Sequence, residues 1–257
     1  MQFRVLGPLE IETDTGLLPL RGAKQRALLA LLLMYPNEVV PRDLLIEGLW
    51  GESAGERAGH SLEAQVSRLR KALFPAGDGT LQTRATGYQL NLHPDELDVL
   101  RFERLLEQAS SALEGGDAAA AAATIREALG LWRGRPFEDV TYESFARIEI
   151  ERLDELRLAA VEDRIEAELA LARHAQLVSE LEALVRRHPL RERFRAQLML
   201  ALYRSGRQAD ALGVYQDARR ALVDELGIEP GPALRELEQA ILRQDPALRS
   251  LEREPSG

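Results

Sequence analysis

Residues 60–74 read HSLEAQVSRLRKALF, and this stretch decides how the first third of the chain folds. At 100° per residue, four leucine and valine side chains fall within about 60° of one another, which predicts an amphipathic helix with one buried stripe. The stripe consists of Leu62, Val66, Leu69 and Leu73. The opposite face carries polar, small or basic residues, namely His60, Ser61, Ala64, Ser67, Arg68 and Lys71, with Gln65 and Arg70 on its flanks. Only Glu63, near the apolar stripe, adds a carboxylate.

This polar face suits the major groove of DNA, which is about 12 Å wide and admits one helix. Arg68 can form a bidentate bond to guanine, and Gln65 can hydrogen-bond to adenine. The small Ala64 lets the helix approach and can contact a thymine methyl group. The alternative is an ordinary exposed helix face whose basic last turn is favoured by the helix dipole.

Other residues of the same helix suit the DNA backbone. Ser61 lies near the N-terminus, where a hydroxyl and free backbone N–H groups can hold a phosphate. Arg70 and Lys71 also favour phosphates, and His60 completes the predicted contact set on this helix.

The flanking sequence favours a winged helix-turn-helix, in which the third helix binds the major groove. Residues 3–20 alternate and turn like a small antiparallel sheet, residues 23–34 form a first helix that Pro36 must end, and Pro41 opens a second helix at its first position. Residues 81–92 predict a hairpin, or wing. It carries Thr83 and Arg84, and an arginine at its tip can enter a narrow minor groove; a solvated turn arginine is the alternative.

Three further basic residues lie at the starts of the first two helices. Lys24 and Arg26 begin the first helix, and Arg42 begins the second. Each is equally consistent with a phosphate contact and with simple solvation, so Lys24 and Arg26 enter the predicted DNA-contacting set with both interpretations open.

From about residue 94 the pattern is helical throughout. Helices are expected near 95–114, 117–132, 144–172, 175–188, 190–205, 208–225 and 231–244, separated by glycine and proline breaks. Ala175, Leu177 and Leu181 recur 34 residues later as Ala209, Ala211 and Tyr215, which is the tetratricopeptide period. The expected fold class is therefore mainly α: an N-terminal winged helix-turn-helix with a small sheet and wing at 1–93, then an all-α tetratricopeptide-like domain at 94–257.

The charge of the chain is unevenly distributed. The formal net charge is −9, but residues 1–93 hold ten Lys or Arg and ten Asp or Glu, so the acidity belongs to the second part. A local basic patch can therefore matter in the first part. The chain has no cysteine, no signal-peptide pattern at its start and no apolar run long enough to span a bilayer, which favours a cytoplasmic protein without membrane contact. DNA binding would make such a protein nucleoid-associated.

No catalytic or cofactor motif stands out. The sequence lacks a phosphate-binding Gly-x-x-x-x-Gly-Lys-Ser/Thr loop and a Gly-x-Ser-x-Gly elbow, and its four histidines have no metal-ligand spacing. We therefore expect no enzyme activity, no cofactor and no metal. A second hypothesis remains: a helical-repeat scaffold that binds proteins and whose winged helix does not bind DNA.

Aromatic residues gather around a break at Gly134 to Pro136. Trp132, Phe137, Tyr142 and Phe145 are expected to pack between helix pairs, with a partner or effector pocket as the alternative. Tyr203 and Tyr215 occupy repeat-like positions and are expected to pack as well.

The run HSLEAQVSRLRKAL followed by LQTRATGYQL resembles the OmpR/PhoB type of winged helix. Together with FRVLGPLEI, RGAKQRALLALLL and DLLIEGLWGE, it resembles the Streptomyces antibiotic regulatory protein (SARP) family. Further segments, including ALGLWRGRPFEDV and ELGIEPGPALRELEQAIL, resemble that family's bacterial transcriptional activation domain. The resemblance covers nearly the whole chain, to about residue 248.

The resemblance implies a transcriptional activator, in antibiotic biosynthesis for example. Such a protein binds direct repeats in double-stranded DNA near a promoter, often as a head-to-tail homodimer, and helps RNA polymerase holoenzyme to engage. By position, the resemblance places Ser61, Gln65, Arg68 and Lys71 on the recognition helix and Arg84 on the wing. With no receiver domain before the winged helix, we expect no phosphorelay switch in this sequence.

Overall fold

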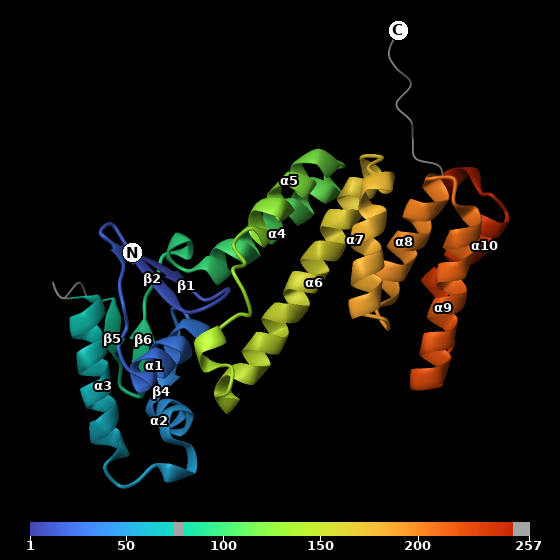
Figure 1. Cartoon of the computed structure of the whole chain (residues 1–257). Coiled ribbons are helices and arrows are strands. Elements are labelled where there is room, and N and C mark those ends of the chain that lie inside the picture. The colour runs from blue at the N-terminus through green and yellow to red at the C-terminus, as the bar shows by residue number, and fades with distance from the viewer. Residues whose placement is uncertain (75–79, 249–257) are drawn as a thin grey trace. The chain divides into compact units, whose positions relative to one another are not determined.

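The computed structural model describes residues 1–74 and 80–248, which form two compact units (Figure 1). Unit 1 comprises Met1–Glu107 and Glu127–Leu158. Unit 2 comprises Gln108–Arg126 and the chain from Ala159 onward. Three helices contribute to both units, because α4 (Asp98–Glu114), α5 (Ala118–Leu129) and α6 (Arg147–Ala170) cross the divisions.

Unit 1 contains two small antiparallel sheets. The first has the order β1-β2-β3 and consists of β1 (Gln2–Arg4), β2 (Glu10–Thr13) and β3 (Gly16–Leu17). The second has the order β4-β6-β5 and consists of β4 (Val39–Pro41), β5 (Leu81–Thr83) and β6 (Gly87–Leu90). In the second sheet Val40 pairs with Tyr88, which ties the wing hairpin to the strand that follows the first helix.

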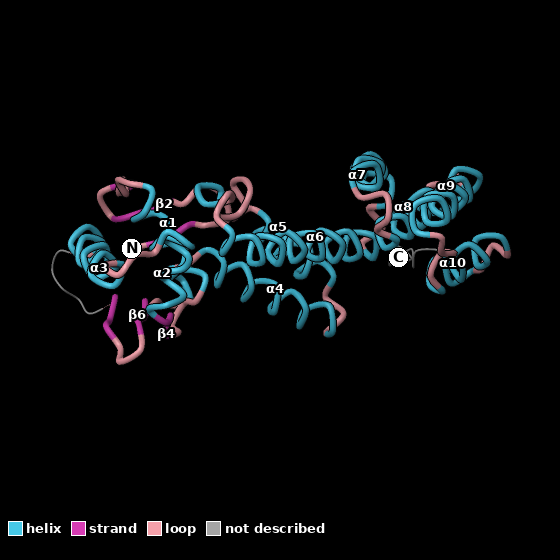
Figure 2. Tube along the Cα trace, turned by 90° about the horizontal axis from the view of Figure 1, so that it is seen from below, coloured by secondary structure: helices cyan, strands magenta, loops and turns pink. Residues whose placement is uncertain are grey.

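Three helices complete the winged helix: α1 (Ala23–Met34), α2 (Arg42–Trp50) and α3 (Ala58–Leu73). Figure 2 shows α1, α2 and α3 beside the strands of the second sheet, and the three helices contact one another. Every residue of α1 from Ala27 to Leu33 is buried, so this leucine-rich run is the core around which α2, α3 and β6 pack. The predicted order of sheet, three helices and hairpin is confirmed.

One helix boundary differs from the sequence prediction. Pro41 is the N-cap of α2, with φ −59° and ψ 145°, and is not its first helical residue. It also ends β4, where it pairs with Gly87. The extended ψ follows from this strand pairing. The first helical residue of α2 is therefore Arg42 and not Pro41.

Segments beyond residue 93 are part of unit 1. The carboxylate of Asp98, at the start of α4, accepts hydrogen bonds from the backbone N–H groups of Val5 and Leu6, at 2.9 and 3.0 Å. The backbone N–H groups of Arg133 and Phe137 donate to the carbonyls of Leu6 and Val5, each at 2.8 Å. Asp98, Arg133 and Phe137 thus hydrogen-bond to the segment directly after β1. The boundary at residue 93 stays a prediction.

Unit 2 is a stack of antiparallel helices. After the second half of α6 come α7 (His174–Arg187), α8 (Glu192–Arg204), α9 (Gln208–Leu226) and α10 (Pro232–Leu242), and α8 packs against α7, α9 and α10. The turns before α7 and α9 contain left-handed residues at equivalent places, Ala172 with φ 58° and Gly206 with φ 77°. These two positions are 34 residues apart, as a tetratricopeptide-like repeat requires.

The aromatic residues near Gly134 divide into buried and exposed. Trp132 and Phe137 are buried, and Trp132 meets Phe102 edge-on with ring centroids 5.4 Å apart. Tyr142 is fully exposed, so its expected core packing is wrong; it follows a short 3₁₀ helix (Glu138–Val140) that points it outward. Tyr215 is buried as expected, and Tyr203 is half-buried. Across the described residues, no helix has the length and apolar content needed to cross a membrane.

Candidate nucleic-acid interface

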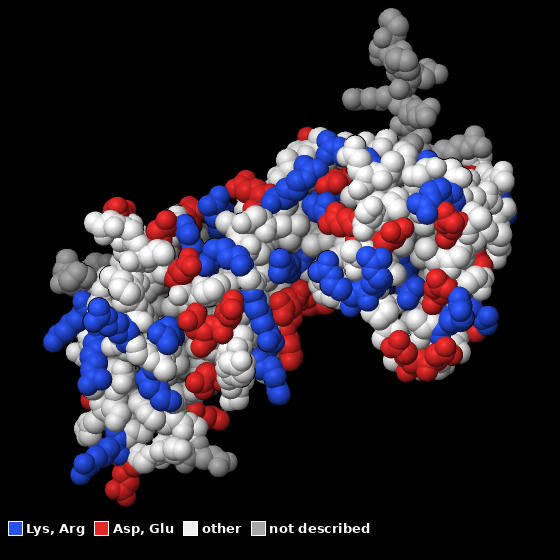
Figure 3. Space-filling view, in the orientation of Figure 1, with Lys and Arg blue, Asp and Glu red and all other residues white. Residues whose placement is uncertain are grey.

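The outer face of α3 is exposed while its inner stripe forms part of the core. Leu62, Val66, Leu69 and Leu73 are each no more than 2% exposed, which confirms the predicted stripe. Six residues of the opposite face are exposed: His60, Ser61, Ala64, Ser67, Arg68 and Lys71. Gln65 is half-buried on the flank. Figure 3 shows Lys and Arg side chains gathered along the surface that α3 forms.

The basic residues at the centre of this face are Arg68 and Lys71. Among the described residues, neither Arg68 nor Lys71 is within ion-pair distance of a carboxylate. Glu63, the one carboxylate on α3, lies 3.3 Å from Nη1 of Arg42 and 3.7 Å from Nδ1 of His60. Its charge is therefore directed toward neighbouring basic side chains, and Arg68 and Lys71 remain available for an anionic partner.

The wing lies next to α3 and presents a further arginine. The backbone N–H of Arg84 donates to the carbonyl of Gly87 at 2.9 Å, which closes the tip of the β5–β6 hairpin. The Arg84 side chain is exposed, with Nε donating to Oε1 of Gln89 at 2.6 Å. Gln89 in turn donates to the carbonyl of Asn37 at 2.7 Å, so the wing arginine is linked to the loop before β4.

Other residues of the predicted contact set already have partners within the chain. Arg70 donates from Nε to the carbonyl of Leu81 at 2.9 Å and from Nη2 to Oγ1 of Thr83 at 2.8 Å. Neither bond was predicted, because both depend on how the hairpin folds back onto α3. Thr83, the predicted DNA contact beside the wing tip, is exposed but accepts this bond.

The two basic residues of α1 also bond within unit 1. Lys24 donates from Nζ to the carbonyl of Leu49 near the end of α2. Arg26 donates to the carbonyl of Leu20 at 3.2 Å and pairs with Asp139 at 3.7 Å. Both residues are therefore bonded within the chain, and their contact with DNA phosphates stays a prediction.

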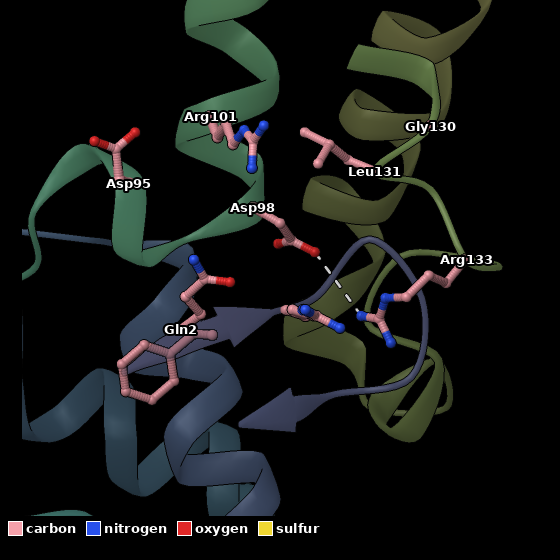
Figure 4. Close-up of a pocket in the computed structure, with 9 residues that line it drawn as sticks. Gln2, Asp95, Asp98, Arg101, Gly130, Leu131 and Arg133 are labelled. Atoms are coloured by element: carbon pink, nitrogen blue, oxygen red, sulfur yellow. Dashed lines mark ion pairs between the residues drawn. The ribbon is translucent and has the colours of Figure 1, made fainter. Parts of the chain in front are cut away.

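A separate cavity of about 240 Å³ lies elsewhere in unit 1, between the start of β1, the start of α4 and residues 130–133 (Figure 4). Its basic residues are matched by carboxylates: Arg4 pairs with Glu12, Arg101 with Glu127 at 2.7 Å, and Arg133 with Glu10 at 2.7 Å. Burial raises the pKa of the Asp98 carboxyl, against the hydrogen bonds from Val5 and Leu6 and the charge of Arg133. The cavity therefore lacks the unneutralised cations of the α3 face.

In the described parts of the chain, no group of three or more His, Cys, Asp or Glu side chains is arranged to hold a metal ion. The exposed face of α3 itself carries arginine, lysine and small polar groups. Such groups bind phosphates and base edges.

Both parts of the chain match known protein families. Residues 97–242 match the family described as bacterial transcriptional activator domain, and residues 20–90 match transcriptional regulatory protein, C terminal. The regulatory protein AfsR of Streptomyces coelicolor is 44% identical over 98% of this chain and 25% of its own length. The regulatory protein DnrI of Streptomyces peucetius is 40% identical over 96% of this chain and 94% of its own length.

A solved structure of Mycobacterium tuberculosis EmbR, in complex with a low-affinity phosphopeptide, has the same fold with a TM-score of 0.92 and 38% identity. It covers 95% of this chain, which spans 65% of the EmbR chain and about a quarter of the AfsR proteins of Streptomyces coelicolor and Streptomyces griseus. The chain belongs to the SARP family of transcriptional regulators, with an OmpR/PhoB-type winged helix followed by a bacterial transcriptional activator domain.

Proposed function

We propose that this protein is a transcriptional activator that binds double-stranded DNA through α3 and the wing. The observation that carries the proposal is the outer face of α3, where Arg68 and Lys71 are exposed and, among the described residues, lack a carboxylate partner. A cation on a surface gains most from a partner of high negative charge density, and duplex DNA is such a partner. The names of the relatives as regulators support the same conclusion.

Six residues of α3 and the wing have assigned contacts in this proposal. Arg68 bonds the O6 and N7 atoms of a guanine, and Gln65 contacts a neighbouring base pair. Ala64 leaves room for the helix to enter the major groove. Ser61 and Lys71 contact phosphates on either side, which fixes the orientation of α3 without selecting a base. Arg84 enters the adjacent minor groove.

The rest of the proposed mechanism rests on the resemblance to the family. Two protomers bind neighbouring direct repeats near a promoter, head to tail, and the helical unit contacts the second protomer and RNA polymerase holoenzyme. The polymerase then occupies a weak promoter more often. The regulated genes are those of secondary metabolism, such as antibiotic biosynthesis, and the protein works in the bacterial cytoplasm at the nucleoid, where its DNA is.

The test begins with a DNA duplex selected by the wild-type chain from a library of random sequences. Mobility shifts at several salt concentrations then compare wild type with Arg68→Ala and Lys71→Ala. Arg68→Ala should cost about 1–3 kcal/mol of binding free energy and relax the sequence preference. Lys71→Ala should weaken selected and unrelated duplexes about equally and reduce the salt slope by roughly one phosphate contact.

Arg187→Ala is the matched control, because it removes one exposed arginine from α7 in the other unit. It should bind the selected duplex as wild type does. If no sequence is enriched by selection, or if both α3 variants bind like wild type, the chain does not bind DNA through α3. The scaffold hypothesis would then be preferred.

A further inference from the structure

Three side chains connect α2, α3 and the wing at the back of the proposed interface. Tyr88 in β6 is 3% exposed, and two guanidinium groups lie near its ring. The Cζ atom of Arg42 is 5.6 Å from the ring centroid, and that of Arg70 is 5.9 Å away. Both distances are within the range of a cation–π interaction.

Arg70 contacts both strands of the wing from α3. Besides facing Tyr88 in β6, it donates to the Leu81 carbonyl and the Thr83 hydroxyl of β5, at 2.9 and 2.8 Å. β5 is the edge strand of the sheet order β4-β6-β5, so this side of β5 has no neighbouring strand. Arg70 therefore bonds the outer edge of the hairpin, and it fixes the hairpin to the helix rather than to β4 alone.

Arg70 differs from its neighbour Lys71 in these contacts. Lys71 is exposed, whereas Arg70 is half-buried and directs its planar donor groups at two acceptors within the chain. A guanidinium can hold two acceptors and an aromatic face at once, and a lysine ammonium cannot reproduce that geometry.

We propose that Arg70 is a positioning residue for two-groove binding. It holds the wing at a fixed distance from α3, so that Arg84 reaches the minor groove when Arg68 is in the major groove. This inference rests on the proposed function, because it assumes that α3 and the wing contact the same duplex. It assigns Arg70 to the wing and not to a phosphate.

A DNA-free measurement tests the positioning directly. The chain has no cysteine, so spin labels can be attached at Ser67→Cys on α3 and Ala85→Cys at the wing tip without other changes. Pulsed electron spin resonance then gives the distribution of distances between the labels. It should be narrow in the otherwise wild-type chain, clearly broader with Arg70→Met or Arg70→Lys, and narrow again with Lys71→Met. An unchanged distribution with Arg70→Met would overturn the inference whatever the chain does with DNA.

Thr83→Val is a milder variant in case Arg70→Met prevents folding. It removes one acceptor of Arg70 and leaves the shape of the side chain almost unchanged. The label distribution should broaden, by less than in Arg70→Met, while the far-ultraviolet circular dichroism stays that of wild type. A distribution as narrow as that of wild type would contradict the proposed link.

A double-mutant cycle on the selected duplex gives the functional readout. Arg84→Ala should weaken binding on the order of tenfold in the wild-type background. In the Arg70→Met background it should have almost no further effect, because the wing no longer reaches its groove. Equal losses in both backgrounds would show that Arg70 does not position Arg84. A chain that selects no duplex at all contradicts the proposed function instead, and the spin-label result then stands on its own.

Discussion

Gly87, at the start of β6, is one of the residues through which the wing pairs with β4. A Cβ atom at this position would lie 1.9 Å from the carbonyl oxygen of Val40 and 2.7 Å from its carbonyl carbon. Both are backbone atoms of β4, so no flexible side chain can move aside. Ordinary contact begins at 3.4 Å, and Gly87→Ala must therefore separate β4 from β6 by about 1.5 Å.

A separation of that size breaks the hydrogen bonds around the pairing. The backbone bonds from Arg42 to Thr86 and from Asn37 to Leu90, each 3.0 Å long, would exceed 4 Å and lose nearly all their strength. With the β4–β6 ladder itself, roughly three bonds of about 1 kcal/mol each are at risk. We expect the free energy of unfolding to fall by about 3 kcal/mol and the melting temperature by about 10 °C.

Thermal unfolding followed by circular dichroism measures this change. Gly59→Ala is the control, because a Cβ there meets nothing within 4 Å and the residue lies inside α3. It should raise the stability by about 0.5 kcal/mol. The strand-packing argument is refuted if Gly87→Ala melts at the wild-type temperature.

Further predictions concern the turns of unit 2 and the sheet edge of unit 1. Ala172, with φ 58°, is a non-glycine residue in the left-handed region, so Ala172→Gly should raise the free energy of unfolding by about 0.5 kcal/mol in urea titrations. Gly206→Ala, at φ 77°, should lower the free energy of unfolding by about 1 kcal/mol. If both substitutions changed it in the same direction, the two turns would not be equivalent positions of a repeat. Burial raises the pKa of Asp98 above 3.8, so the folded chain keeps this proton at pH values where the unfolded chain has lost it. The free energy of unfolding should therefore fall as the pH rises from 3.8 through the folded pKa of Asp98, and Asp98→Asn should remove this pH dependence. Urea titrations across this pH range measure it. If wild type and Asp98→Asn change in parallel, Asp98 is not the cause.

The helix α3 was predictable because its pattern is local. Leu62, Val66, Leu69 and Leu73 repeat with the helical period, so the sequence alone indicates which side is buried and which is exposed. The same argument places Arg68 and Lys71 on the exposed face, as the structure confirms. Their contact with DNA stays a prediction.

Contacts between distant segments were not predictable in this way. Arg70 and Lys71 are adjacent basic residues in one helical turn, and only the folding of the hairpin onto α3 gives Arg70 its partners in β5. The hydrogen-bond partner of Lys24 likewise lies near the end of α2, and the partners of Asp98 lie directly after β1. In each case the bonding partner is set by tertiary packing, which leaves no trace in the spacing of nearby residues.

The central claim is that Arg68 bonds a guanine in the major groove, and base substitution tests it most directly. Each guanine of the selected duplex is replaced in turn by 7-deazaguanine, which lacks the N7 acceptor, and binding is measured for wild type and Arg68→Ala. The account predicts one position where wild type loses on the order of tenfold in affinity and Arg68→Ala loses nothing further. Equal losses for both proteins at every guanine would contradict it.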